Sequence, residues 1–408
     1  MTASRSSRTV AVLTALLVLA LPACNAGGAT GDGMSRGDAA PTTSAPPVPP
    51  PVLPAVISTD PPLESLDVAP VTPLQVDVAH GTLTTVTVTD EDGAAVPGGM
   101  ATDGSSWTAS ADLAYGATYA VAATAVDAGG MPSDVAGTIS TVRPRTLTMP
   151  TVFPSADSGT VGVGQPLSVT FDEDVIDRAA VERRLHVTTT PPVAGSWSWQ
   201  SDRSVHYRPE QYWPARTHVA VDVDVYGVDV GKGVYGQASR HVQFDIGAKR
   251  VGVVDATERV LRLYIDDQLV KTMPTSLGKA SNPTPTGTYV VMQQSRRYTM
   301  RSATYGVPLG APGGYETPVE YASRLSNSGI FVHAAPWSVA DQGRRNVSHG
   351  CLNVSTADAA WFYANFGRGD VLQVANAGPA LQVWDGFGDW NESWSDWQAG
   401  SALAVPAG

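Results

Sequence analysis

The sequence is poor in cysteine, in positive charge and in long hydrophobic segments. Only two of its 408 residues are cysteines, Cys24 near the N-terminus and Cys351 near the C-terminus. Acidic residues outnumber basic ones by 38 to 26, and the formal net charge of −12 argues against a nucleic-acid-binding protein. No basic block or interleaved aromatic stripe offsets this charge.

The hydrophobic run Val10–Leu21 contains about twelve residues, which is too short to span a bilayer. Two arginines precede it, so we interpret residues 1–23 as an export signal peptide. The run ends in Leu21-Pro22-Ala23-Cys24, which resembles a lipobox and predicts a diacylglycerol anchor on the Cys24 sulfur. The alternatives are a plain secretory peptide or an uncleaved anchor. We therefore expect an exported protein, lipid-anchored to the cell membrane and facing the periplasm or cell wall. An acylated Cys24 could not pair with Cys351.

The next segments predict a tether followed by two β modules. Residues 24–58 are rich in Gly and Ala and then in Pro, a composition typical of an extended linker. From 59 to 145 and from 146 to 247 the sequence shows short β patterns with frequent turn signals and no helical periodicity. The alternation along Val219–Val225, for example, indicates a half-buried strand. Two immunoglobulin-like β-sandwich modules are expected, acting as spacers.

Residues 248–376 predict a third, β-rich domain with one short helix. Strands are expected at 251–255, 260–265, 268–272, 288–293 and 370–375. Between them, Tyr298–Gly314 is rich in Gly, Pro and Tyr and lacks a regular pattern, which suits a lid. The helix is expected at Ala357–Phe366, with a capping box formed by Ser355 and Asp358. The fold class is therefore mainly β.

The C-terminal extension, 377–408, contains four of the ten tryptophans. Trp390, Trp394 and Trp397 are spaced as on one face of a short helix. We expect this face to pack on a neighbouring domain and the extension to lie on the third domain, 248–376; the alternative is a glycan-binding face.

Cys351 lies in a sequence that favours nucleophilic catalysis. A free cysteine has a pKa of about 8.5 and needs a basic neighbour to react as thiolate near neutral pH. His349 is too close in sequence to turn readily toward Cys351, so His333, on another segment, is the expected base. The amides of His349, Gly350 and Cys351 could stabilise a developing oxyanion, and Asn353 could brace the loop. The alternative chemistry is a zinc site formed by His333, His349 and Cys351, although no obvious fourth ligand lies nearby.

These residues carry a resemblance to a known family. His333, in Ile330-Phe331-Val332-His333-Ala334, is followed after about fourteen residues by Ser348-His349-Gly350-Cys351-Leu352-Asn353. This pattern resembles the signature of the L,D-transpeptidases (YkuD type), and Thr284-Pro285-Thr286-Gly287-Thr288-Tyr289 matches it further. The resemblance covers roughly 248–408, and the two upstream modules resemble those of the mycobacterial and other actinobacterial lipoprotein members.

The resemblance implies a catalytic Cys351, a general base and acid at His333, and a backbone carbonyl at Ala334 that orients His333. Position 334 is Ala where relatives often carry Ser, which leaves that carbonyl in place. The expected substrate-binding residues are Met300, Tyr305, Tyr315, Trp337, Ser348 and Asn353.

The implied reaction joins peptidoglycan stem peptides through 3→3 diaminopimelate cross-links. A tetrapeptide donor would acylate Cys351 and release D-Ala, and the diaminopimelate amine of a second stem would accept the acyl group. The resemblance also implies a role in cell-wall biogenesis, remodelling and cell shape, acylation by carbapenems, and no metal or organic cofactor. The alternatives are water as acceptor (an L,D-carboxypeptidase), a protein amine as acceptor (protein anchoring), and a non-enzymatic wall-binding lipoprotein.

Overall fold

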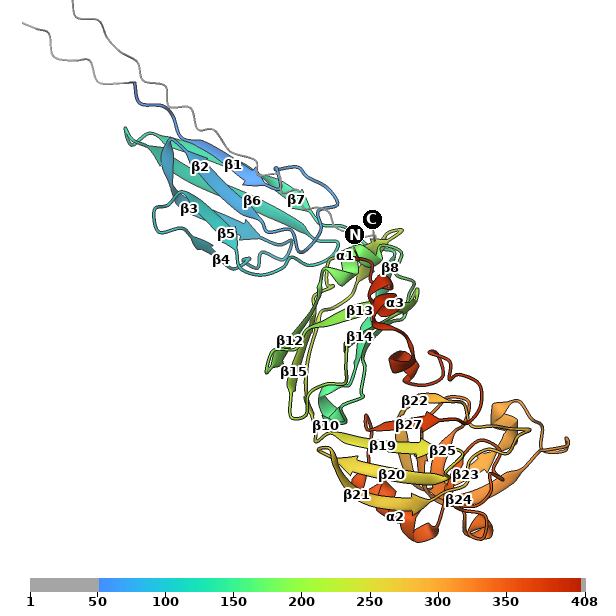
Figure 1. Ribbon diagram of the computed structural model, residues 1–408. Coiled ribbons are helices and arrows are strands. Elements are labelled where there is room, and N and C mark those ends of the chain that lie inside the picture. The colour runs from blue at the N-terminus through green and yellow to red at the C-terminus, as the bar shows by residue number, and fades with distance from the viewer. Residues whose placement is uncertain (1–50, 405–408) are drawn as a thin grey trace, which may run out of the picture. The chain divides into compact units, whose positions relative to one another are not determined.

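The computed structural model describes residues 51–404, and β-strands dominate them, which confirms the expected fold class (Figure 1). The predicted signal peptide, Cys24 and most of the Pro-rich linker lie outside the described residues. Within residues 51–404, no helix is both long enough and apolar enough to cross a membrane.

The first sandwich consists of two facing sheets. One contains, in order, β1 (Val56–Asp60), β2 (Gln75–Ala79), β5 (Ser106–Ala109) and β4 (Gly98–Met100). The other contains β3 (Gly81–Thr89), β6 (Thr118–Asp127) and β7 (Pro132–Ser140). Alternate side chains such as Val76, Trp107 and Val121 form the core between the sheets. β1 begins before residue 59, so the linker ends earlier than the composition indicated.

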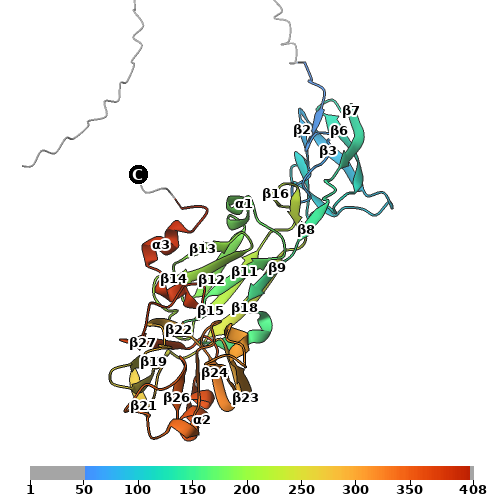
Figure 2. The same ribbon diagram turned by 90° about the vertical axis from the view of Figure 1, so that its right-hand side faces the viewer.

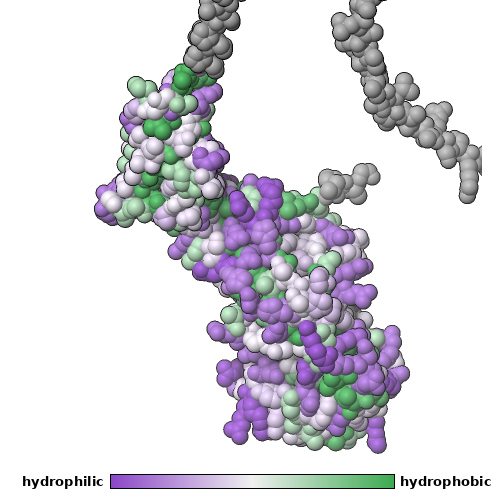
Figure 3. Space-filling view, turned by 90° about the vertical axis from the view of Figure 1, so that its left-hand side faces the viewer, coloured by the Kyte–Doolittle hydropathy of each residue, from purple (hydrophilic) through white to green (hydrophobic). Residues whose placement is uncertain are grey.

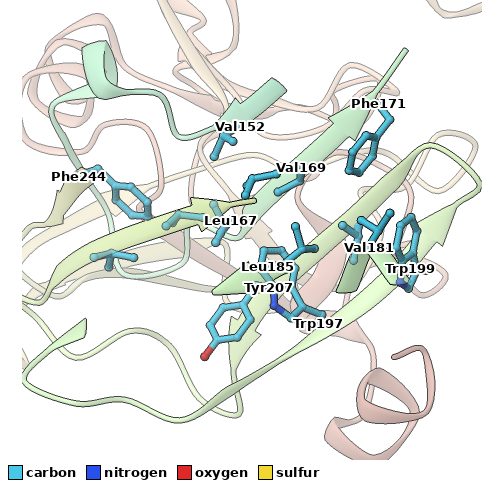
Figure 4. Packing of buried hydrophobic residues seen from close by; sticks show 14 of the residues in the cluster. Val152, Leu167, Val169, Phe171, Val181, Leu185, Trp197, Trp199, Tyr207 and Phe244 are labelled. Carbon is cyan, nitrogen blue, oxygen red and sulfur yellow. The ribbon is translucent and has the colours of Figure 1, made fainter. Parts of the chain in front are cut away.

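The second sandwich has two four-stranded sheets. The first sheet contains β10 (Thr160–Val161), β18 (Arg240–Ile246), β15 (His218–Val223) and β12 (Leu185–Thr190). The second contains β13 (Gly195–Ser201), β14 (Ser204–Pro209), β11 (Leu167–Phe171) and β9 (Pro150–Phe153). Figure 4 shows residues of both sheets, including Leu167, Trp197 and Phe244, meeting in one core. A small sheet of β16 (Asp229–Gly231), β17 (Val234–Gly236) and β8 (Thr146–Thr148) lies beside them.

A short helix, α1 (Arg178–Glu182), interrupts the second sandwich and was not expected from the sequence. Five residues are too few for a helical period to show. Its signal is local instead, since the Asp177 carboxylate accepts a hydrogen bond from the Ala180 amide.

The C-terminal domain is built from two sheets. The five-stranded sheet has the order β21 (Gln268–Pro274), β20 (Val260–Ile265), β19 (Arg250–Asp255), β27 (Val371–Ala375) and β22 (Gly287–Val290). The four-stranded sheet has the order β23 (Gln293–Arg301), β24 (Glu316–Arg324), β25 (Phe331–Ala334) and β26 (Leu352–Val354). The helix α2 (Thr356–Asn365) packs on β24 and β25, and Ser355 caps it as predicted.

The segment expected to be an irregular lid is partly regular. Its first residues, Tyr298–Arg301, continue β23, because β24 supplies an antiparallel partner with Met300 opposite Thr317. The short helix η2 (Ser302–Tyr305) and a loop then connect the two strands. Pairing with a distant strand thus overrides the weak local pattern.

The C-terminal extension corrects two expectations. Trp390 lies in η4 (Gly388–Asn391), whereas Trp394 and Trp397 lie in α3 (Trp394–Ala399), so the three do not share one helix. α3 packs on β13 of the second sandwich rather than on the catalytic domain, and both ribbon views place it there (Figures 1 and 2).

The physical reason lies in a buried cation on β14. The guanidinium carbon of Arg208 is 4.9, 5.4 and 4.5 Å from the ring centroids of Trp390, Trp394 and Trp397. The Trp397 indole also donates to the Ser196 carbonyl at 2.9 Å. Only the earlier part of the extension rests on the catalytic domain, through buried Leu381 among other residues. On the face drawn in Figure 3, hydrophobic residues form small patches among hydrophilic ones.

Candidate active site

Two neighbouring parallel strands bring the predicted base and nucleophile together. β25 and β26 pair in parallel with His333 opposite Asn353, and Cys351 directly precedes β26. Because side chains alternate along a strand, Cys351, His333 and Asn353 project from the same face. All three line one cavity of about 280 Å³.

His333 is held as a neutral base. Its Nδ1 lies 2.9 Å from the Ala334 carbonyl oxygen, the contact that the family resemblance implies. Since a carbonyl only accepts, Nδ1 carries the ring proton and Nε2 keeps its lone pair. Burial lowers the pKa of His333 to about 4, against the opposing effect of hydrogen bonds to Ala334 and Asn353.

Cys351 is held as a neutral thiol. Its Sγ lies 3.4 Å from the Gly329 carbonyl oxygen, to which it donates. Burial raises the pKa of Cys351 to about 12, with the Phe331 amide acting in the opposite direction. Burial thus favours the uncharged form of both groups in the resting site.

The loop before Cys351 is fixed by buried hydrogen bonds. The Ser348 hydroxyl donates to the Cys351 carbonyl at 2.7 Å and accepts from the Gly350 amide at 3.1 Å. The Thr284 hydroxyl donates to the Gly350 carbonyl at 2.7 Å and accepts from the Gly278 amide at 2.9 Å. Thr284 belongs to the second quoted motif, so the two motifs meet at the nucleophile.

Gly350 is required by the shape of this loop. Its φ of +127° is one that other residues rarely adopt, and a Cβ there would lie 2.8 Å from Ile330 Cδ1. A glycine at position 350 therefore allows the backbone conformation that places Cys351 at the cavity.

The expected oxyanion hole is corrected at one position. The Gly350 amide donates to Ser348 Oγ, a local turn typical of serine, and is therefore not free to bind an oxyanion. In contrast, within residues 51–404 the amides of His349 and Cys351 donate to no protein acceptor. These two remain the candidates for stabilising an oxyanion.

His349 faces a different partner from His333. Its Nε2 lies 3.1 Å from the Lys279 ammonium, and its ring is 5.4 Å from the Tyr315 ring. Partial burial and the Lys279 charge both lower the pKa of His349. Lys279 was not predicted to be near the site, because it lies in a loop without a regular sequence pattern.

The cavity contains most of the predicted substrate-binding residues. Met300, Tyr315, Trp337, Ser348 and Asn353 all line it, whereas the side chain of Tyr305 lies outside what the structure describes. Sequence reasoning missed the other lining residues, because single polar or aliphatic residues carry no signature: these are Thr317, Val319, Ser338, Asp341 and Val347.

A larger cavity of about 520 Å³ lies between the second sandwich and the five-stranded sheet. Tyr212, Lys249 and Trp390 are among its lining residues, and it contains neither Cys351 nor His333. The reactive groups therefore define the smaller cavity as the candidate active site. Among the described residues, no three His, Cys, Asp or Glu side chains are grouped so that they could hold a metal ion, so the zinc alternative gains no support there.

Comparisons with known proteins show which proteins this chain resembles. Residues 249–374 match the profile of the L,D-transpeptidase catalytic domain, and residues 65–229 match that of a bacterial Ig domain. L,D-transpeptidase 2 of Mycobacterium tuberculosis is 43% identical over 333 residues, which are 81% of this chain and 81% of that protein. L,D-transpeptidase 5 of the same species is 36% identical over 84% of this chain and 76% of that protein. A solved structure of L,D-transpeptidase LdtMt1 in complex with imipenem is 37% identical over 55% of this chain and 97% of that chain, with a TM-score of 0.49.

Proposed function

Because the chain belongs to the L,D-transpeptidase family, we propose that Cys351 and His333 transfer an acyl group from one peptidoglycan stem peptide to another. The observation that carries this proposal is the parallel pairing of β25 and β26, which sets an imidazole and a thiol on one face of one cavity. The tautomer of His333 leaves a ring nitrogen ready to take the thiol proton.

The first half-reaction forms a thioester. Cys351 Sγ attacks the carbonyl carbon of the third stem residue, diaminopimelate, while His333 takes the thiol proton. The amides of His349 and Cys351 stabilise the negative oxygen of the tetrahedral intermediate. The bond to D-Ala then breaks, and His333 returns the proton to the departing D-Ala amine.

The second half-reaction releases the enzyme. The side-chain amine of a diaminopimelate residue in a second stem attacks the thioester, with loss of a proton to His333. The carbon–sulfur bond breaks, Cys351 regains its proton and a 3→3 cross-link is left. The same thiol would attack the strained ring of a carbapenem and be acylated. In the cell, these links would serve wall biogenesis and remodelling and the maintenance of cell shape.

The test uses the chain without its predicted signal peptide and a purified disaccharide-tetrapeptide, with mass spectrometry as the readout. We expect a dimer that lacks one D-Ala, and no such product from Cys351→Ala. A tripeptide monomer alone would identify water as the acceptor and a carboxypeptidase. Unchanged substrate with both proteins would contradict the proposed chemistry.

We further propose that Cys24 carries the lipid that anchors the protein outside the cell membrane. The lipobox-like sequence before Cys24 and the Pro-rich composition of 25–58 support this, because a lipidated cysteine followed by an extended tether suits a wall enzyme. We expect Cys24→Ala to abolish incorporation of labelled fatty acid and to move the protein from the membrane fraction to a soluble one. Equal labelling of both proteins would contradict lipidation at this site.

A further inference from the structure

A charged pair in the wall of the Cys351 cavity has no part in the mechanism above. Asp341 lines the cavity together with Cys351 and His333. Its side chain is 19% exposed, whereas that of its partner Arg345 is 75% exposed. The partly buried carboxylate of Asp341 thus faces the cavity that contains the reactive groups, and the exposed side chain of Arg345 pairs with it.

The pair leaves one carboxylate oxygen available. Arg345 Nε and Nη2 both donate to Asp341 Oδ1, at 2.8 and 2.5 Å. Among the described residues, none donates a hydrogen bond to Oδ2. A carboxylate oxygen accepts from ammonium groups readily, so Oδ2 is a ready acceptor for a cationic ligand.

Asp341 is positioned by the strands that carry the reactive groups. Its amide donates to the Ser338 carbonyl at 2.9 Å, and the Gln342 side chain donates to the Ala335 carbonyl at 3.2 Å. The Ala335 amide in turn donates to the Val354 carbonyl at 2.9 Å. The carboxylate therefore belongs to the wall that continues directly from His333.

The proposed reaction brings an amine close to the cavity wall that contains Asp341. His333 donates a proton to the departing D-Ala amine and later takes one from the attacking amine, so both amines occupy the position beside His333. The attacking amine arrives from water as an ammonium ion, since alkyl amines have a pKa of roughly 10. Water, the competing acceptor, carries no charge.

We propose that Asp341 is a specificity-determining residue that receives the ammonium group of the acceptor, and that Arg345 competes with the acceptor for this carboxylate. The inference rests on the proposed function and adds to it the reason that an amine is preferred over water. The bound ammonium ion loses one proton to solvent, and the free amine then attacks the thioester. It passes a second proton to His333, which returns it to the Cys351 sulfur as the carbon–sulfur bond breaks, and Asp341 pairs with Arg345 again.

The test measures how much of the thioester reacts with the diaminopimelate amine and how much reacts with water. The full chain without its signal peptide is given the disaccharide-tetrapeptide as donor and acceptor, and the ratio of cross-linked dimer to tripeptide monomer is measured. Asp341→Asn is expected to lower this ratio about three- to tenfold, and Arg345→Ala to raise it. Added salt should lower the ratio in the wild type and have little effect on Asp341→Asn.

Two controls separate charge recognition from a structural effect. Glu258→Gln removes the carboxylate of another i,i+4 pair with arginine, Glu258–Arg262, which does not line the cavity, and should leave the ratio unchanged. Hydroxylamine, a nucleophile that is neutral at neutral pH, should resolve the thioester equally fast in wild type and Asp341→Asn.

The outcomes are distinct. An unchanged dimer-to-monomer ratio in Asp341→Asn, or an equal loss of the hydroxylamine reaction, would overturn the role of Asp341 and leave the proposed function intact. Absence of D-Ala release from the wild type would instead overturn the proposed function on which the inference rests.

Discussion

His333 and Cys351 owe their reactivity to burial rather than to a preformed ion pair. Burial disfavours both charged forms, so it lowers the pKa of the imidazole to about 4 and raises that of the thiol to about 12. An uncharged thiol resists oxidation and alkylation better than a thiolate does. The substrate carbonyl, by providing a place for the negative charge, makes the proton transfer favourable.

This electrostatic state predicts the pH dependence of alkylation in the free enzyme. At pH 8, iodoacetamide should modify Cys351 roughly a hundredfold or more slowly than free cysteine, because the raised pKa leaves far less thiolate. The rate should continue to rise above pH 9, where that of free cysteine levels off. Mass spectrometry of the modified protein gives the rates, and a plateau below pH 7 would show a thiolate–imidazolium pair instead.

The identities of the reactive residues could be read from the sequence, but their hydrogen bonds could not. Cys351 is the only cysteine in the sequence besides Cys24, and its spacing from His333 matches a specific signature. That the Gly350 amide binds Ser348 rather than an oxyanion depends on one side-chain rotamer. Lys279 and Asp341 come close to the reactive groups only through folding, and no local pattern marks them.

At the scale of elements, local signals predicted the elements that local interactions stabilise. The α2 cap at Ser355 and the alternation along β15 are examples, since a side-chain cap and a buried face are both encoded within a few residues. β23 was not predicted, because its pairing with β24 is non-local. α3 packs on the second sandwich, where Arg208 contacts Trp397, and not on the catalytic domain as expected. Arg208 is distant in sequence, so this contact could not be predicted.

The docking of α3 can be tested with two tryptophans of the same extension. Trp397 is fully buried, so Trp397→Ala should lower the free energy of unfolding by about 3–5 kcal/mol. Trp384 is 72% exposed, and Trp384→Ala should change it by about 0.5 kcal/mol or less. Calorimetry of the full chain measures both, and equal destabilisation by the two substitutions would contradict the docked arrangement.

At the scale of the whole molecule, the reactive groups and the cavity around them lie in the C-terminal domain. The described residues of the two β-sandwiches do not line the cavity around Cys351, and their expected role as spacers stays a prediction. The C-terminal extension connects the catalytic domain to the second sandwich, since Leu381 lies in the core of the former and the Trp397 indole donates a hydrogen bond to Ser196 of the latter. Composition predicted the order of these parts; the return of the chain to the second sandwich could not be predicted, because it depends on surfaces formed only in the folded protein.

The parallel pairing of β25 and β26 has a consequence for how such an enzyme can diverge. Two parallel neighbours cannot be joined by a tight turn, so the chain must make a crossover, here residues 335–350, before it reaches the nucleophile. The ladder fixes the reacting atoms, while much of the crossover is exposed to solvent and includes Trp337, Asp341 and Arg345. Substitutions at the exposed positions of this segment can therefore change the wall of the cavity, while the ladder keeps the thiol and the imidazole on one face. The reacting pair and the surface that meets a substrate can thus diverge separately.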